Sequence, residues 1–145
     1  MTKTKKTTKK RNYTYAVGRR KTATARIRLF KSKTVPETKS QLIVNGKPVE
    51  EYFAGEENKS EYRKPFLLTN TLTKLSVSAK VQGSGKPSQL KAVIHGISRA
   101  LIKEDEKHRP ILKKEGLLTR DPRAKESRKV GTGGKARRKK QSPKR

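Results

Sequence analysis

The stretch that decides the fold is LSVSAKVQGSGKPSQLKAVIHGISRALIK, residues 75–103. In its first part apolar residues alternate with polar ones, at Leu75, Val77, Ala79 and Val81. This period of two predicts a strand with one buried face. In its second part apolar residues recur at helical spacing, at Leu90, Val93, Ile94, Ile97, Ala100 and Leu101. The stretch therefore predicts a strand, a glycine-rich turn and an amphipathic helix from Leu90 to Lys103.

The turn between the two elements, Gly83–Ser88, has the composition of an anion site. A glycine-rich loop that enters a helix exposes backbone N–H groups at the positive end of the helix dipole, and Lys86 adds a full charge. We expect Ser88 to cap the helix and Gly96 to let it approach a sheet closely. The loop lacks the Walker pattern, since Pro87 follows Lys86. RNA phosphate is the favoured occupant, and a purely structural turn is the alternative.

A second strand is predicted upstream, where Ala23, Ala25, Ile27 and Leu29 alternate with polar residues. Arg26 and Arg28 then project from its solvent face. We expect the segment Gly18-Arg19-Arg20-Lys21 to interrupt the β-forming run before it, with Gly18 permitting a bulge or a close backbone approach. Its three cations are placed to hold a phosphate, and a solvated turn is the alternative.

Shorter elements are expected elsewhere in the chain. Asn45-Gly46 is a strong hairpin-turn signal, whereas Gly55–Lys64 has the composition of a charged loop. The remaining expected elements are a strand at Gln41–Val44, a short helix or turn at Pro48–Phe53, a helix at Pro65–Leu72, and a helix at Arg109–Lys114 that ends at Gly116. Leu117 and Leu118 should then fix the root of the C-terminal tail to the core.

The charge of the chain is its strongest functional signal. It has 40 Lys or Arg residues against 12 Asp or Glu, a formal net charge of +28, and only 29% hydrophobic residues. Such a charge drives association with polyanions, so nucleic acid is the leading partner and anionic lipid the runner-up. No basic amphipathic helix with bulky apolar residues is present, nor a run of about twenty apolar residues, so we expect no membrane role.

Residue types also limit the chemistry. The chain has no cysteine and two histidines, His95 and His108, which excludes thiolate chemistry and is too few for a histidine-based metal site. We therefore predict no metal site.

Composition divides the chain into three parts. Residues 1–12 are a basic N-terminal extension that we expect to be disordered, residues 13–118 form a globular RNA-binding domain, and residues 119–145 form an extended basic tail. The last eighteen residues contain nine Lys or Arg and no acidic residue, and cannot bury enough apolar surface to order themselves without a polyanion.

Several motifs in a fixed order resemble one family. They are GRRKTATARI at 18–27, VNGKPVEEYF at 44–53, GISRAL at 96–101, GLLTRDPR at 116–123, KARR at 135–138 and the terminal Lys144-Arg145. Together they resemble the universal family of small-subunit ribosomal protein nine, in its bacterial or organellar form. The resemblance implies an α+β fold: one small domain with a mixed sheet and helices on one face, similar to the second domain of small-subunit ribosomal protein five.

The resemblance also implies a function without catalysis, with no catalytic residue, no cofactor and no small-molecule substrate. The protein would be a structural constituent of the small ribosomal subunit, in the cytoplasm or in an organelle, and would support assembly and translation. It would bind rRNA in the subunit head beside neighbouring head proteins and send its tail towards the anticodon region of the peptidyl-site (P-site) tRNA. A free-standing nucleic-acid compaction protein and a small-molecule kinase-like phosphotransferase are the alternatives, although no acidic pair is placed to hold magnesium.

The site residues that follow are basic. For rRNA they are Arg19, Arg20, Lys21, Arg26, Arg28, Lys86, Arg120, Arg123, Arg128, Lys129, Lys135, Arg137, Arg138, Lys139 and Lys140. For tRNA they are Lys144 and Arg145. The tail departs from the family near its tip, where Ser142 stands in the position of a usual aromatic residue and Pro143 in that of a serine. Base stacking at that point is therefore not expected.

Overall fold

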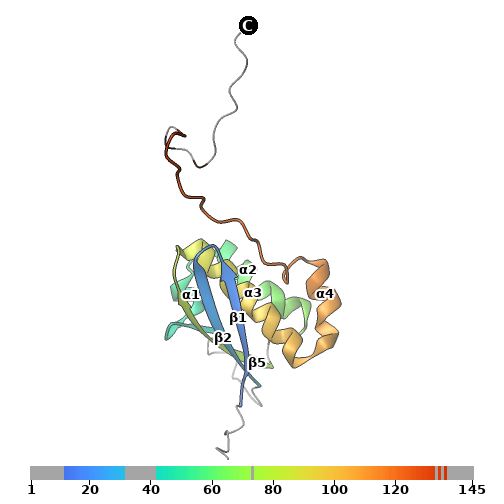
Figure 1. Ribbon diagram of the computed structural model, residues 1–145. Coiled ribbons are helices and arrows are strands. Elements are labelled where there is room, and N and C mark those ends of the chain that lie inside the picture. Colours follow the sequence, from blue (N-terminus) through green and yellow to red (C-terminus); the bar gives the residue numbers. More distant parts are fainter. Residues whose placement is uncertain (1–11, 32–41, 73, 133, 135, 137–145) are drawn as a thin grey trace, which may run out of the picture.

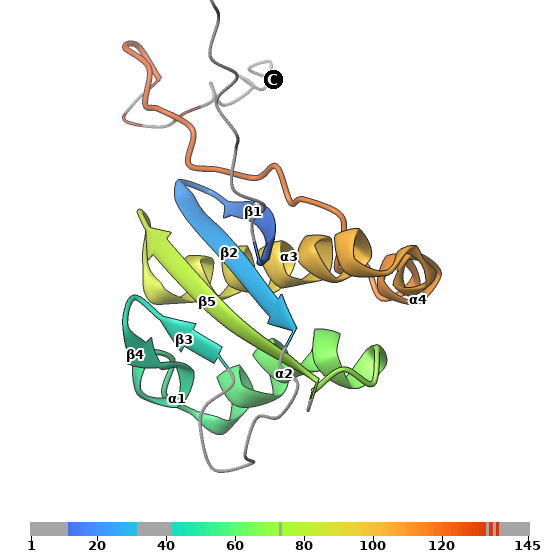
Figure 2. The ribbon, with the colours of Figure 1, turned by 90° about the horizontal axis from the view of Figure 1, so that it is seen from below.

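One mixed sheet organises the domain (Figures 1 and 2). The computed structural model describes residues 12–31, 42–72, 74–132, 134 and 136. Its five strands are β1 (Thr14–Arg20), β2 (Ala23–Lys31), β3 (Leu42–Val44), β4 (Lys47–Pro48) and β5 (Leu75–Gln82), in the sheet order β1-β2-β5-β3-β4. β3 runs parallel to β5, and the other neighbouring pairs are antiparallel.

The main helices lie on one face of this sheet (Figure 2). The helical segments of the domain are α1 (Val49–Tyr52), α2 (Glu56–Leu68), α3 (Lys86–Glu104), a single 3-10 turn η1 (Glu106–His108) and α4 (Arg109–Lys114). α3 packs across β1 and β2 and covers their buried side chains, whereas Arg26 and Arg28 on the opposite face are exposed. The predicted α+β domain with a mixed sheet and helices on one face is confirmed. No helix among the described residues is long and apolar enough to cross a membrane.

Two glycines allow α3 to touch β1. A Cβ atom on Gly18 would lie 1.9 Å from the carbonyl oxygen of Ala92 and 2.4 Å from the backbone nitrogen of Gly96. A Cβ on Gly96 would lie 2.6 Å from Cγ1 of Ile27. The close approach expected at both glycines is thus confirmed. Gly18 forms no bulge, because it pairs in regular register with Ala25.

The expected interruption at residues 18–21 was wrong. β1 continues through Arg20, and the chain reverses at Lys21-Thr22, where Lys21 has a φ of 50°. Gly18 weakens a strand in isolation, but here the backbone of α3 fills the space that a side chain would occupy. Tertiary packing therefore keeps the strand continuous up to the hairpin turn.

The loop expected at Gly55–Lys64 and the helix expected at Pro65–Leu72 were also wrong, since α2 is one helix over Glu56–Leu68. Its buried stripe consists of Tyr62, Pro65 and Phe66, at spacings of three and four residues. The remaining positions are mostly charged or polar, so the segment had the composition of a loop. The helix ends at Leu68, and the hydroxyl of the next residue, Thr69, donates to the Pro65 carbonyl at 2.9 Å.

The long helix α3 begins earlier than expected. Gly85 precedes its first residue, Lys86, and Pro87 lies in the first turn, where a missing N–H is tolerated. Ser88 lies inside the helix, is buried, and is not the N-cap, which corrects the expectation for this residue.

Other expectations were confirmed. Asn45 and Gly46 both have positive φ and form the hairpin turn between β3 and β4. α4 ends at Lys114, just before Gly116, and Leu117 and Leu118 are partly buried against the core.

Candidate nucleic-acid interface

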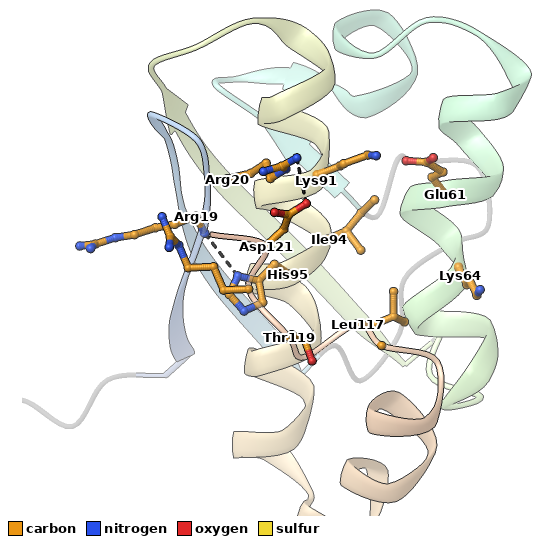
Figure 3. A pocket seen from close by; sticks show the side chains of 12 residues that line it. Arg19, Arg20, Glu61, Lys64, Lys91, Ile94, His95, Leu117, Thr119 and Asp121 are labelled. Atoms are coloured by element: carbon orange, nitrogen blue, oxygen red, sulfur yellow. Dashed lines mark hydrogen bonds and ion pairs between the residues drawn. The ribbon is translucent and has the colours of Figure 1, made fainter. Parts of the chain in front are cut away.

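The turn end of the β1–β2 hairpin is joined to the root of the C-terminal tail (Figure 3). The Arg20 guanidinium lies 2.9 Å from Oδ2 of Asp121 and donates to the backbone carbonyl of Arg123 at 2.7 Å. Its side chain is only 14% exposed. These contacts, which we call the tail-root clamp, bring together two segments about a hundred residues apart and fix where the tail leaves the domain.

Asp121 is the centre of the clamp. Its carboxylate accepts hydrogen bonds from the Arg123 side chain, at 2.8 Å to Nη2, and from the Arg123 backbone N–H, at 2.9 Å. These bonds, with the charge of Arg20 added, hold the pKa of Asp121 well below its usual range. The carboxylate therefore stays charged at physiological pH, and both guanidiniums remain attached to it.

A half-buried histidine holds the same end of the hairpin to α3. His95 Nδ1 accepts a hydrogen bond from the Arg19 backbone N–H at 3.4 Å. Burial lowers the pKa of His95, and the positive charge of Arg99 lowers it further. The ring is therefore neutral near pH 7, which its role as an acceptor requires.

Three side chains of α3 cover the outer edge of β1. Arg99 Nη1 donates to the Val17 carbonyl at 2.5 Å, and Lys103 Nζ donates to the Tyr15 carbonyl at 2.9 Å. With His95 they form a row at intervals of four residues along one helix face. The row satisfies backbone groups that an edge strand would otherwise present to other chains. This role was not predicted from the sequence, although polar residues at a regular spacing of four were a signal for it.

A pocket with a volume of about 320 Å³ lies between the hairpin end, α2, α3 and the tail root (Figure 3). Its basic lining residues are Arg19, Arg20, Lys64, Lys91 and Arg120, and its acidic ones are Glu61 and Asp121. Arg20 is paired with Asp121, and Lys64 is paired with Glu115. The other charged lining residues are Arg19, Lys91 and Arg120 against Glu61, so the pocket keeps a positive excess. No group of His, Asp and Glu able to hold a metal ion occurs in the part of the chain that the structure describes.

The lysine of the glycine-rich turn contacts α1. Lys86 Nζ donates to the Tyr52 backbone carbonyl at 3.0 Å and lies 3.3 Å from the centroid of the Tyr52 ring. Gln89 bridges the same region, because its amide donates to Gly83 and accepts from the Tyr52 hydroxyl. Lys86 therefore attaches α1 to the start of α3 and is still exposed, so its contact with rRNA stays a prediction.

The other predicted site residues fall into three groups. Arg19 and Lys21 are exposed at the hairpin end, and Arg26 and Arg28 are exposed on the sheet. Exposed residues of the tail are Arg120, Arg123, Arg128 and Lys129, of which Arg123 is tied to Asp121. The predicted residues that lie outside the described residues are Lys135, Arg137, Arg138, Lys139, Lys140, Lys144 and Arg145.

Two comparisons with known proteins point to one family. The model of a family described as ribosomal protein S9/S16 matches residues 18–145, from the hairpin glycine through the whole tail. A curated relative, small ribosomal subunit protein uS9 of Maridesulfovibrio salexigens, is 46% identical over 124 residues, which cover 86% of this chain and 91% of that protein. The chain therefore belongs to the ribosomal protein S9/S16 family.

Proposed function

We propose that this chain is a structural constituent of the small ribosomal subunit and binds small-subunit rRNA through the cations of its domain and tail. The observation that carries the proposal is the tail-root clamp. It joins the motif GRRK of the hairpin to the motif TRDPR at the tail root, through Arg20 and Asp121. The exposed cations Arg19, Lys21 and Arg120 lie around this junction.

The clamp fixes the position of the tail root relative to the basic end of the β1–β2 hairpin. A rigid domain that carries cations can be seated on folded RNA, while a basic segment anchored at one point follows the RNA from there. The net charge of +28 supplies the sequence-independent attraction that such a protein needs. A free-standing compaction protein has no need of a fixed exit point for its tail, so the clamp favours a place in an assembled particle.

The finer proposal concerns the end of the tail. Lys144 and Arg145 contact the P-site tRNA near its anticodon, while the cations between Arg128 and Lys140 follow rRNA in the subunit head. The support is the resemblance of the terminal Lys-Arg pair to the family pattern. Neighbouring proteins of the subunit head are the remaining partners of the chain.

The test is co-sedimentation. The tagged full chain is expressed in cells, and small subunits are isolated on a gradient after a high-salt wash. The wild-type chain is expected to remain with the subunits, and a variant that lacks residues 119–145 is expected to be washed off more easily. A wild-type chain that the wash removes as completely as a nonspecific basic protein contradicts the proposal.

A further inference from the structure

The face of the sheet opposite the helices forms a second basic surface. Register places Val17, Arg26 and Lys80 in one cross-strand row and Tyr15, Arg28 and Ser78 in the next. Arg19, Thr24 and Gln82 form a third row on the same face. We call this surface the open sheet face. Arg19, Arg26, Arg28 and Lys80 are all exposed on it.

The described strands contribute no acidic residue to this surface. None of the five described strands contains an Asp or Glu. The ion pairs found among the described residues join other partners, and none includes Arg26, Arg28 or Lys80. Arg26 lies directly opposite Lys80 in the register. Like charges in that position destabilise a sheet, so the protein alone leaves an unfavourable contact that an anion would relieve.

One end of the open sheet face also holds a guanidinium in place. The Arg28 Cζ atom lies 5.4 Å from the centroid of the Tyr13 ring, and this ring packs against Phe30 with centroids 5.7 Å apart. A guanidinium that stacks on a ring loses less side-chain freedom when it binds a phosphate. Arg28 is therefore presented to solvent in a partly fixed position.

We propose that the open sheet face binds the sugar–phosphate backbone of small-subunit rRNA, as a contact surface separate from the tail. Arg26 and Arg28 are two residues apart on one strand, so their Cα atoms are about 7 Å apart. The Cα atom of Lys80 lies about 5 Å from that of Arg26 on the neighbouring strand. A cluster of three charges so close together suits a polyanion with closely spaced charges better than single carboxylates of a protein. This inference rests on the proposed function.

The experiment compares two triple variants of the full chain. R26Q/R28Q/K80Q removes three charges from the open sheet face, and K107Q/K113Q/K114Q removes three exposed charges from η1 and α4 on the helical side. Binding to a transcript of the small-subunit rRNA is measured over a series of salt concentrations. Because each phosphate contact contributes about 0.7 to 0.9 to the salt slope, the sheet variant should lose about two units of slope and bind about tenfold or more weakly. The control variant should lose less than about half a unit.

Thermal melting separates binding from folding. The sheet variant is expected to melt at the wild-type temperature or slightly above it, because Gln removes the repulsion between Arg26 and Lys80. Equal slopes for the two variants, with wild-type binding intact, overturn the inference and leave the proposed function standing. Normal rRNA binding with poor incorporation into subunits also overturns it, in favour of a protein on this face. Wild-type protein that fails to bind the transcript contradicts the inference and the proposed function together.

Discussion

At the scale of single residues, two glycines set the distance between the main helix and the edge strand. Gly18 and Gly96 face each other, and the Ala92 carbonyl lies where a side chain of Gly18 would be. This contact brings α3 close enough for Arg99 and Lys103 to reach the carbonyl groups of β1. The edge of the sheet is therefore closed only because these two positions have no side chain.

Gly18→Ala should consequently destabilise the domain by about 3 kcal/mol, since backbone atoms and not flexible side chains must move to admit the methyl group. Gly85→Ala is the matched control, because its nearest non-neighbouring atom is 3.9 Å away and its φ is −93°. Urea denaturation of the isolated proteins provides both values. A Gly18→Ala variant as stable as Gly85→Ala would show that α3 can shift without cost.

His95 should make the stability of the domain depend on pH. Its pKa is lowered in the folded state, so the contribution is complete above the unfolded pKa of about 6.5 and decreases as the pH falls below it. Protonation removes the acceptor for the Arg19 N–H and adds a cation beside Arg99 and Arg120. The loss of about one hydrogen bond, about 1 kcal/mol, corresponds to a decrease of about 4 °C in Tm.

The measurement is thermal melting at pH 7.5 and pH 5.5, a range above the titration of the carboxylates. His95→Gln should abolish most of the difference between the two temperatures, whereas His108→Gln should keep it. If the His95 variant retains the full difference, another group is responsible for it.

At the scale of elements, strands were more predictable than helices. The alternation in β2 and β5 is visible in the sequence, because each strand has one buried and one solvent face. α2 was not predictable, because only Tyr62, Pro65 and Phe66 are buried and the remaining residues are mostly charged or polar. The continuity of β1 was missed for a related reason, since Gly18 is stabilised by a helix more than seventy residues away.

The positive charge of the candidate site could be predicted from the sequence, but the partners of its side chains could not. Arg26 and Arg28 were placed on the solvent face by periodicity alone. Sequence cannot distinguish Arg20, which is tied to Asp121, from Arg19 beside it, because the partner lies about a hundred residues further along the chain. The contacts of Lys86 could not be predicted for the same reason, since Tyr52 comes close to it only in the folded protein.

The tail-root clamp leads to a prediction at this scale. Arg20→Ala should release the tail root, so that the amides of residues 119–123 exchange hydrogen faster. The stability of the domain should change by less than about 1 kcal/mol, because Asp121 is partly exposed and keeps its bonds to Arg123. Arg19→Ala is the control, since the clamp does not use its side chain. Hydrogen exchange with mass spectrometry provides both comparisons, and equal exchange in the two variants argues against a clamp.

At the scale of the whole molecule, the described acidic residues lie in helices and loops and are absent from the described strands. The described strands contain no carboxylate, whereas Glu50, Glu51, Glu56, Glu57 and Glu61 gather in and around α1 and α2. RNA therefore meets least repulsion on the open sheet face and at the hairpin end. The tail leaves the domain beside Arg20, at the turn end of the β1–β2 hairpin (Figure 1).

The last prediction concerns the tail tip. Lys144 and Arg145 are two of 40 basic residues, and the terminal carboxylate offsets part of their charge. Bulk attraction alone would make their deletion almost unnoticeable, so any effect must come from where they are placed. Arginine can hold a phosphate through two parallel hydrogen bonds, and one such contact in a partly desolvated site is worth about 1 to 2 kcal/mol.

Deletion of Lys144 and Arg145 should therefore leave assembly intact and weaken tRNA binding to the P site about five- to thirtyfold, which corresponds to about 1 to 2 kcal/mol. Filter binding of tRNA to subunits reconstituted with full-length or shortened chain, at matched salt, measures this. Removal of Lys139 and Lys140 by substitution with Gln is the control, since it deletes two charges and keeps the tip. Equal tRNA affinities for full-length and shortened chains would mean that the tail, with Ser142 and Pro143 in place of the usual residues, stabilises rRNA alone.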